Sequence, residues 1–535
     1  MAQTKLMPQG TQGIEQYKSI ANSKGMSATA TNNKRIAKNA MALYFRMILI
    51  TCVGLYTSRI ILKVLGVNDY GIYNAVGGII AMFNIIRGSL AASTQRYITY
   101  GLGKNDHTYL NKVFSTSVII HICLAILIVL LAETIGLWFL YNKMIIPEER
   151  MVATFWVYQC VVASSVIMLI SIPYNALIIA HEKMGIYAKI SIFEAFAKLF
   201  IVFLLQFVTY DRLIVYAFLL VMVELSIRVW YTMYCKKNYK ESNVIYQIDK
   251  SLIKEIAVFA GWSFFGNAAY ITYTQGLNIL LNTFFGPVVN AARGIAIQVQ
   301  SLTHQLVTGF QTAINPQITK SYASGNLTYM HSLIFRSCKF SYYLILLISI
   351  PIIVETDTIL RVWLGDYPEN TVTFIRIILL TTLINSMANP LITAVKATGK
   401  VKKYESIVGG LMLTILPISY ICLRLGYPPY SVFLVHLTIE IIAQNIRVLI
   451  VGKSLKFSFW KFFFNIQFRI IFITILASIL PLYLHHISDG TIIASIAICT
   501  ISVVCSAVVI AIFGLNKNER NTILHLISKK ILKKK

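Results

Sequence analysis

The sequence predicts an all-α polytopic membrane protein of about fourteen transmembrane helices, built as two six-helix bundles in tandem plus two C-terminal helices. Three observations predict this fold class. The 535 residues are 57% hydrophobic and only 13% charged, which is more apolar surface than a water-soluble globule can bury. Apolar runs of about 20 residues, the length that crosses hydrocarbon as a helix, recur along the chain. The third observation is an internal repeat.

The repeat relates Gly66–Tyr109 to Gly286–Tyr329, at a shift of 220 residues. Each stretch reads as a polar turn, an apolar helix with a polar stripe and a short exit loop. A shift of 223 is the alternative, since it matches Gly71 to Gly294. The preceding helix repeats in the frame of 220, so we predict two parallel copies of one membrane bundle. In this frame Thr108 corresponds to Thr328, Asn84 to His304, and Gln95 to Asn315.

The apolar runs define the helices in order, and their helical period and length exclude barrel strands. The first bundle has helices at 41–65, 72–100, 110–141, 152–180, 186–208 and 213–234. A charged segment, 236–254, separates the bundles. The second bundle has helices at 256–285, 289–319, 327–354, 372–395, 407–423 and 431–451. Two further runs, 468–484 and 491–513, are expected to lie at the periphery.

Five segments follow from this reading. Residues 1–35 are predicted to form a polar cytoplasmic tail. Because this segment is rich in serine, threonine, asparagine and glutamine, we expect it to lack regular structure. It has no positively charged region followed by an apolar core, so we do not expect a cleavable signal peptide. The first bundle is expected at 36–240 and the second at 241–453. The two additional helices occupy 454–514, and a basic cytoplasmic tail occupies 515–535.

Lysine and arginine gather in the loops on one side of the predicted helices. Lys104, Lys183 and Lys396 lie on that side with the basic tail, whereas Asp69 and Glu149 lie on the other. By the positive-inside rule both termini are cytoplasmic. We therefore attribute the formal net charge of +27 to basic loops and a basic tail that set the orientation in the membrane and lie on anionic lipid headgroups. We expect no nucleic-acid partner.

The motifs of common catalytic sites are absent from the sequence. Gly452-Lys453-Ser454 ends like a phosphate-binding loop, but Arg447 stands where the first glycine is required. The eight cysteines are not at metal-ligand spacing. We therefore expect no catalytic residues, no metal and no cofactor. A polysaccharide polymerase or ligase would need a large outward loop, and the longest one, 355–371, is short and has no histidine.

Polar side chains form stripes on several predicted helices. In the helix 289–319 they are spaced 7, 4, 7 and 4 residues apart, on one face: Arg293, Gln300, His304, Gln311 and Asn315. Asn84, Arg87 and Gln95 share a face in the helix 72–100. An ionisable group at mid-membrane costs roughly 3 kcal/mol, so these stripes predict a hydrated cavity between the bundles. His304 taken alone is better explained as a hydrogen-bonded packing residue, whereas its place on the stripe makes a role in binding about equally well supported.

Two acid–base pairs have the spacing of ion pairs within a helix. Glu194 precedes Lys198, and Glu224 precedes Arg228, each by four residues with the acid first. A structural ion pair and a role in ion coupling are both open for these residues. Glu440, in the helix 431–451, is the third candidate for coupling.

Four motifs resemble bacterial polysaccharide flippases. They are Leu-Gly-Val-Asn-Asp-Tyr-Gly-Ile-Tyr-Asn at 65–74, Ser-Thr-Gln-Arg-Tyr at 93–97, the stretch 173–183 and Pro-Leu-Ile-Thr-Ala at 390–394. These O-antigen and capsule exporters are a branch of the multidrug/oligosaccharidyl-lipid/polysaccharide exporter superfamily. The resemblance covers nearly the whole chain, and it implies that the protein is a transporter and not an enzyme.

The resemblance implies a flippase of the bacterial inner membrane that moves undecaprenyl-diphosphate-linked oligosaccharide without ATP. It also implies a cationic cavity, for which the candidates are Arg59, Arg87, Arg293 and Lys198. Arginine grips a diphosphate through paired donors. The expected partners are the lipid-linked oligosaccharide, membrane lipids and other polysaccharide-assembly proteins. The alternatives are a multidrug exporter coupled to an ion gradient and a flippase for the lipid-linked peptidoglycan precursor.

Overall fold

The computed structural model describes residues 11–81, 84–144, 146–245, 249–517 and 519–521. Within these ranges the side chains of Arg59 and Asn84 lie outside the described part. The described residues are helical throughout, apart from short connections, and they contain no strand. The predicted all-α fold class is therefore confirmed.

The first bundle contains seven α-helices. They are α1 (Thr11–Ala81), α2 (Asn84–Lys104), α3 (His107–Leu131), α4 (Leu137–Lys143), α5 (Met151–Ala180), α6 (Met184–Leu204) and α7 (Arg212–Asn238). A π-helical turn, Ala132–Gly136, joins α3 to α4, so these two elements form one predicted span.

The second bundle begins at α8 and is followed by two added helices. Its elements are α8 (Lys250–Phe285), α9 (Pro287–Ala323), α10 (Leu327–Val354), α11 (Thr356–Leu364), α12 (Thr371–Asn385), α13 (Ala388–Thr398), α14 (Lys402–Tyr404), α15 (Gly410–Leu413), α16 (Ile415–Arg424) and α17 (Ser431–Leu455). The short α18 (Phe459–Phe462) leads into α19 (Arg469–Ile487), and α20 (Ile492–Val509) follows. Both α19 and α20 pack against α10.

The same backbone kink occurs at the start of both repeats. Gly66 divides α1 with φ 79° and ψ 168°, and Gly286 separates α8 from α9 with φ 76° and ψ −170°. These torsions are essentially restricted to glycine. The exit loops also match, because Asp106 accepts a hydrogen bond from the Tyr109 amide, as Asn326 does from the Tyr329 amide. The two parallel repeats and their frame of 220 residues are confirmed.

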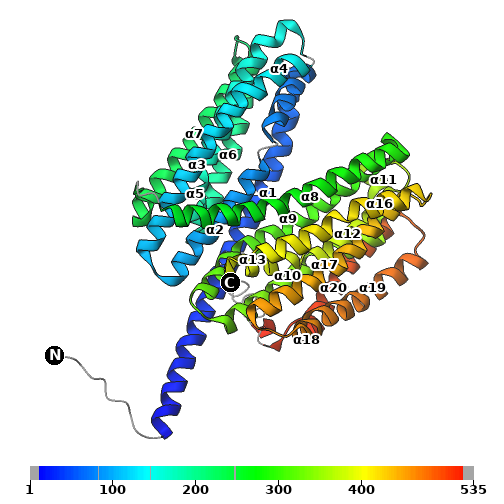
Figure 1. The fold of residues 1–535 in the computed structure, drawn as a ribbon. Helices are drawn as coiled ribbons and strands as arrows, with labels where there is room; N and C mark the ends of the chain where they lie inside the picture. Colours follow the sequence, from blue (N-terminus) through cyan, green and yellow to red (C-terminus); the bar gives the residue numbers. More distant parts are fainter. Residues whose placement is uncertain (1–10, 82–83, 145, 246–248, 518, 522–535) are drawn as a thin grey trace, which may run out of the picture.

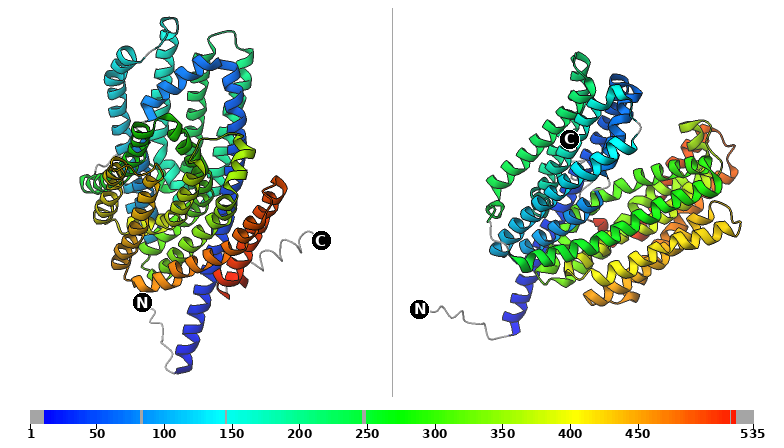
Figure 2. Two further views of the ribbon diagram at one scale, coloured as in Figure 1. Left: turned by 90° about the vertical axis from the view of Figure 1, so that its right-hand side faces the viewer. Right: turned by 45° about the horizontal axis from the view of Figure 1, so that its top comes forward.

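The two bundles diverge from a shared end (Figures 1 and 2). Helix α2 packs against α8 and α9, and α1 packs against α9. At the shared end, Gly103 and Lys104 of α2 lie next to Lys320 of α9. Asp69, which pairs with Arg150 before α5, and Glu355, which precedes α11, lie at the opposite ends of their bundles. The bundles therefore meet on the basic side that the loop charges distinguish.

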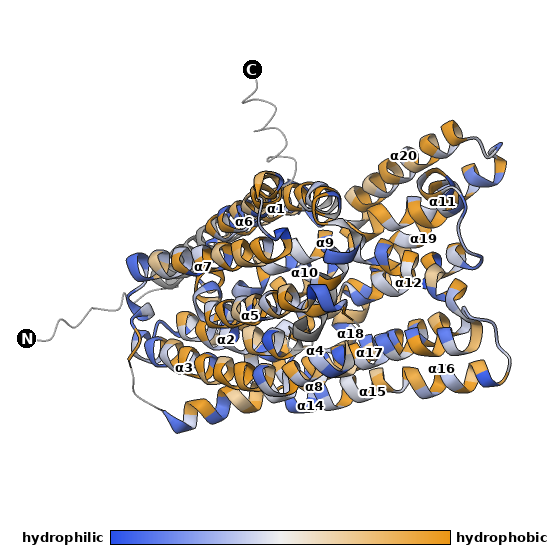
Figure 3. Ribbon diagram, turned by 90° about the horizontal axis from the view of Figure 1, so that it is seen from above, coloured by the Kyte–Doolittle hydropathy of each residue, from blue (hydrophilic) through white to orange (hydrophobic). Residues whose placement is uncertain are grey.

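Eleven helical segments of the described chain are long and apolar enough to cross a membrane. Large apolar side chains such as Phe207 (85% exposed) and Ile493 (82% exposed) are exposed, and hydrophobic residues predominate along most of the helices (Figure 3). The protein is a multi-pass membrane protein. The part of α1 after Gly66, helix α2, and helices α8 and α9 are also long but are not among these eleven segments, and α2, α8 and α9 hold most of the predicted polar stripes.

The amino-terminal segment differs from the prediction. Helix α1 begins at Thr11, so residues 11–35, expected to lack regular structure, are helical. Residues 11–35 contain no proline, and their alanines and glutamines favour a helix. The polar composition suggested disorder, but these residues continue the first apolar helix towards the amino terminus.

Candidate functional site

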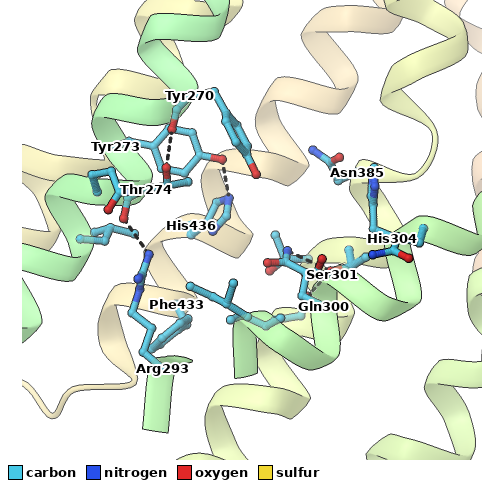
Figure 4. Close-up of a pocket in the computed structure, with 17 residues that line it drawn as sticks. Tyr270, Tyr273, Thr274, Arg293, Gln300, Ser301, His304, Asn385, Phe433 and His436 are labelled. Atoms are coloured by element: carbon cyan, nitrogen blue, oxygen red, sulfur yellow. Dashed lines mark hydrogen bonds between the residues drawn. The ribbon is translucent and has the colours of Figure 1, made fainter. Parts of the chain in front are cut away.

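A polar pocket of about 400 Å³ lies inside the second bundle (Figure 4). Helices α8, α9, α12 and α17 form its walls. Gly286 and Pro287 set the start of α9, and the polar stripe of α9 then faces the pocket. Its polar lining includes Tyr270, Tyr273, Thr274, Arg293, Gln300, His304, Asn385 and His436.

Arg293 is the only cation that the pocket's described lining holds apart from the histidines, and it is 7% exposed. Its guanidinium donates to Asn278 Oδ1 at 3.1 Å and to the Thr274 carbonyl at 2.7 Å. Both acceptors are neutral, and the described lining contains no aspartate or glutamate. Since a buried cation is costly without a counter-charge, this arrangement is suited to an anionic ligand.

Neutral polar groups surround the arginine. Gln300 donates to Thr382 Oγ1 at 3.1 Å, and Tyr273 Oη lies 3.4 Å from His436 Nε2 (Figure 4). The pocket thus combines one buried positive charge with amide, hydroxyl and imidazole groups. These groups can donate and accept hydrogen bonds with a polar ligand.

The C-terminal half of the α9 stripe does not reach the pocket. Gln311 is 2% exposed and donates to Ser341 Oγ at 3.0 Å and to the Ser386 carbonyl at 2.8 Å. Asn315 donates to Asn389 Oδ1 at 3.1 Å. These two residues connect α9 to the neighbouring helices, so the predicted stripe divides into a pocket half and a packing half.

A second pocket, of about 290 Å³, lies inside the first bundle. Arg87, Lys198 and Glu224 line it. Lys198 Nζ lies 2.6 Å from Glu194 and 3.4 Å from Glu224. Arg87 makes no ion pair among the described residues, and its guanidinium is 3.4 Å from the sulfur of Met168.

The predicted pair of Glu224 with Arg228 is wrong. Helix α6 packs beside α7 and brings Lys198 to Glu224. The guanidinium of Arg228 lies 4.1 Å from the centre of the Tyr174 ring instead. One lysine therefore serves both carboxylates, and the arginine makes a cation–π contact.

The structure separates the predicted cationic residues into two pockets. Arg87 and Lys198 share the first-bundle pocket, and Arg293 occupies the second-bundle pocket. Gln95 is half-buried on α2 and lines neither pocket. The side chains of Arg59 and Asn84 lie outside the described residues.

Glu440 belongs to a buried polar cluster next to the second-bundle pocket. Its Oε1 atom accepts from Arg447 at 2.5 Å and from Asn385 at 3.0 Å. Asn385 also lines the pocket, so it joins the cluster to the site. Glu440 Oε2, the Gln444 amide and Arg447 Nε are buried without a hydrogen-bond partner among the described residues.

A contact that the sequence did not reveal joins the bundles at their shared end. Glu182, in the loop after α5, accepts from Gln317 at 2.8 and 2.7 Å and from Lys320 at 2.6 Å, both on α9 of the other bundle. Arg35 of α1 completes the set at 2.8 Å. We call these four residues the Glu182 latch. The one feature of the sequence that could have indicated this contact is an acidic residue, Glu182, in a loop on the side where the basic residues gather.

A second contact at the shared end uses backbone carbonyls. Arg96 of α2 donates to the carbonyls of Lys396 and Ala397, each at 3.1 Å, at the end of α13. Its guanidinium also lies 4.3 Å from the centre of the Tyr97 ring. The shared end is therefore closed by specific polar contacts between the bundles.

Comparison with known proteins identifies the fold. Residues 263–421 match the model of the MatE family. The crystal structure of a mutant MATE protein is similar with a TM-score of 0.70 and 12% identity, over 79% of this chain and 96% of that chain. The fold is that of the MATE transporters.

Two further structures agree with the MATE fold. One is an outward-facing multidrug resistance MATE family transporter of the MOP superfamily, with a TM-score of 0.67 and 12% identity. The other is a MOP superfamily transporter from Pyrococcus furiosus, with a TM-score of 0.67 and 13% identity. Both comparisons cover 79% of this chain and 96% of the other. A search of the curated proteins finds no match.

Proposed function

We propose that this protein is a flippase that moves undecaprenyl-diphosphate-linked oligosaccharide across the bacterial cytoplasmic membrane by alternating access. The MATE fold supports transport as the activity class. The observation that carries the substrate class is Arg293, a buried cation whose partners in the pocket are neutral.

An anion is the ligand that balances this site. Each guanidinium offers planar paired donors that match phosphate oxygens, and the interaction is strong where water is excluded. Arg87 in the first bundle is a second arginine without an ion pair among the described residues. Each bundle therefore offers one such arginine to the diphosphate during transport, and the more deeply buried Arg293 is the one to which we assign it.

The rest of the second-bundle pocket fits a sugar. Gln300, His304 and Asn385 provide amide and imidazole groups, and Tyr270 and Tyr273 provide hydroxyls beside aromatic faces. Sugar hydroxyls both donate and accept hydrogen bonds, so they need a lining of this mixed kind. Gln311 and Asn315 contribute by holding α9 in place.

The conformation supports alternating access. If the basic side faces the cytoplasm, as the positive-inside rule predicts for the loops and both termini, the bundles are closed there by the Glu182 latch and separated outside. A similar structure, that of the multidrug resistance MATE family transporter, is described as outward-facing. Transport would require the latch to open.

Energy would come from the membrane potential or from an ion gradient. Moving one negative charge outward from an inside-negative cell releases about 2.3 kcal/mol per 100 mV. Glu194 and Glu224 beside Lys198, and Glu440 beside Arg447, are the carboxylates that could couple an ion to the movement.

A multidrug exporter is the second candidate function, and Glu224 favours it. This carboxylate lines the first-bundle pocket and could attract an organic cation. The transporter from Pyrococcus furiosus is described as having a binding pocket of reversed polarity, which suggests a different function for that protein. We apply the same criterion, the charge of the pocket, to this chain, and Arg293 favours an anion. A flippase for the peptidoglycan precursor would use the same cationic site.

The test is glycan export in a strain that lacks the native copy. Wild type, Arg87→Ala, Arg293→Ala and a matched control, Arg361→Ala, are expressed at equal levels. Arg361 is paired with Asp357 on the short helix α11 and is 70% exposed in its side chain. We expect wild type and the control to restore surface glycan, and each pocket variant to leave lipid-linked oligosaccharide at the inner face.

The alternatives give different results. Unchanged surface glycan in the deletion strain, with increased sensitivity to cationic drugs, would identify a drug exporter. Arrested peptidoglycan synthesis with accumulation of its lipid-linked precursor would identify the third function. Full activity of Arg293→Ala would refute the assignment of the diphosphate to the second-bundle pocket.

A further inference from the structure

A groove of about 690 Å³ lies at the shared end, where the two bundles meet. The start of α8 forms one wall, and α2 and the α13–α14 connection form the others. The groove is separate from the two pockets described above, because it shares no lining residue with either. Figure 3 shows α14 next to α8 in the view from above.

The rim of the groove is strongly basic. Arg96, Lys254, Lys400 and Lys402 line it, and Glu255 is the one acidic residue in its described lining. The three lysines are exposed and make no ion pair among the described residues. Lys402 Nζ lies 5.4 Å from the centre of the Trp262 ring. The groove therefore carries uncompensated positive charge over its rim.

The inner wall of the groove is apolar. Lys254, Val258 and Trp262 follow one another at intervals of four residues, so they lie on one face of α8. Val258 is 51% exposed although it is aliphatic, and Phe259 packs edge-to-face on Tyr97 of α2. Along α8 the groove changes from charged at the helix start to apolar within two turns.

We propose that this groove binds one anionic phospholipid. The phosphate of the headgroup would lie among Lys254, Lys400 and Lys402, and the acyl chains would lie against Val258 and Trp262. Free phosphate would use the basic rim alone and would leave the apolar wall uncovered. A phospholipid satisfies both parts of the groove, and basic pockets between membrane helices are suited to such headgroups.

Because the groove lies where the two bundles meet, a bound lipid would affect the equilibrium between conformations. Arg96 belongs to the first bundle, whereas the lysines belong to the second. A lipid that fills the groove would also lie against Arg96 and Tyr97 of α2, so it would bind best when the bundles meet here and would stabilise the conformation described above. By linkage, a ligand shifts an equilibrium by its difference in affinity for the two states.

The test measures lipid retained by the full-length purified protein. Native mass spectrometry would count phosphatidylglycerol and phosphatidylcholine adducts on wild type and on Lys254→Ala/Lys400→Ala/Lys402→Ala. The matched control is Lys236→Ala/Lys237→Ala/Lys240→Ala, which removes the same charge from the end of α7, outside the groove. We expect phosphatidylglycerol binding to fall roughly ten-fold or more in the groove variant only.

Two further arms separate the sources of phosphate. Inorganic phosphate should not displace phosphatidylglycerol, and Trp262→Ser should weaken lipid binding while all the lysines are present. If inorganic phosphate displaces the lipid or Trp262→Ser has no effect, the groove is an anion site and not a lipid site. Preference for undecaprenyl diphosphate over phosphatidylglycerol would assign the groove to the transported substrate and overturn the proposal.

The conformational effect has its own readout. Hydrogen exchange of the amides in 250–262 should slow in phosphatidylglycerol nanodiscs relative to phosphatidylcholine nanodiscs. The single variant Lys402→Gln, which changes one exposed side chain, should lose part of this protection. Equal exchange in both lipids, or equal loss in the α7 control, would overturn the proposal.

Discussion

The carboxylate of Glu182 and the ammonium group of Lys320 lie 2.6 Å apart and belong to different bundles. The Glu182 side chain has no exposed surface, and two more donors, from Gln317 and Arg35, reach the same carboxylate. Removing a partner from a buried charge is strongly destabilising, because the charge is then left uncompensated. Opening the shared end would separate Glu182 from α9.

Glu182→Gln tests the latch. The substitution keeps the size of the side chain but removes the carboxylate charge next to Lys320, so we expect a loss of about 3 kcal/mol in the closure of the shared end. Faster hydrogen exchange at the end of α9 and a lower thermal midpoint would show it. Lys183→Gln, at the exposed neighbouring position, is the control and should change neither.

Gly66→Ala and Gly286→Ala test the shared kink. A Cβ atom at either position meets nothing within 4 Å, so the effect is purely conformational. Because φ is positive and ψ is near 180°, each substitution should cost about 1–3 kcal/mol. A lower midpoint of thermal unfolding is the expected result. Gly71→Ala, at a helical position with open space, should be neutral or stabilising.

Asp211 provides a test against pH at the separated end of the first bundle. Partial burial acts to raise the pKa of its carboxyl, but hydrogen bonds from Arg150 and from the Ile214 and Leu213 amides outweigh burial and hold the pKa below 3.8. A carboxyl whose pKa is lowered by folding contributes stability above its unfolded pKa, and this contribution is lost as the pH falls through the folded pKa.

Arg150→Met should therefore destabilise the protein most at neutral pH. The pairs of Arg150 with Asp211 and Asp69 are partly exposed, so the expected loss is about 1 kcal/mol. The difference in thermal midpoint between variant and wild type should shrink as the pH falls below about 4. A difference that is constant from pH 7 to pH 3 would show that packing, and not charge, accounts for it.

Glu440 and Arg447 form a buried pair that a double-mutant cycle can evaluate. Their side chains are 0% and 5% exposed, so removing either charge leaves the other buried and unpaired. Glu440→Gln and Arg447→Met should each destabilise by about 3 kcal/mol, and the double variant by less than the sum. Additive shifts in unfolding free energy would mean that the two charges do not interact.

The sequence was sufficient for the fold because membrane burial leaves few options. The length of the apolar runs predicted the membrane helices. The repeat of the glycine turns predicted the two bundles and the frame that relates Gly66 to Gly286. Helical periodicity also placed Arg293, Gln300 and His304 on the face of α9 that lines a pocket.

Contacts between helices required the structure. Spacing within α7 suggested Arg228 as the partner of Glu224, but the packing of α6 against α7 places Lys198 there. The division of the α9 stripe at Gln311 depends on where Ser341 and Ser386 lie. Glu182 and its partners are more than a hundred residues apart, so no local pattern could join them.

The matching torsions at Gly66 and Gly286 show a common backbone plan, yet the side chains around it have diverged. In the frame of 220 residues, the position of Arg293 is occupied in the first bundle by Tyr73, and that of Arg87 in the second bundle by Val307. Duplication supplies two scaffolds, and each can acquire its own chemistry. A residue that matters in one half therefore needs no counterpart in the other, and symmetry is a poor guide to which residues to mutate.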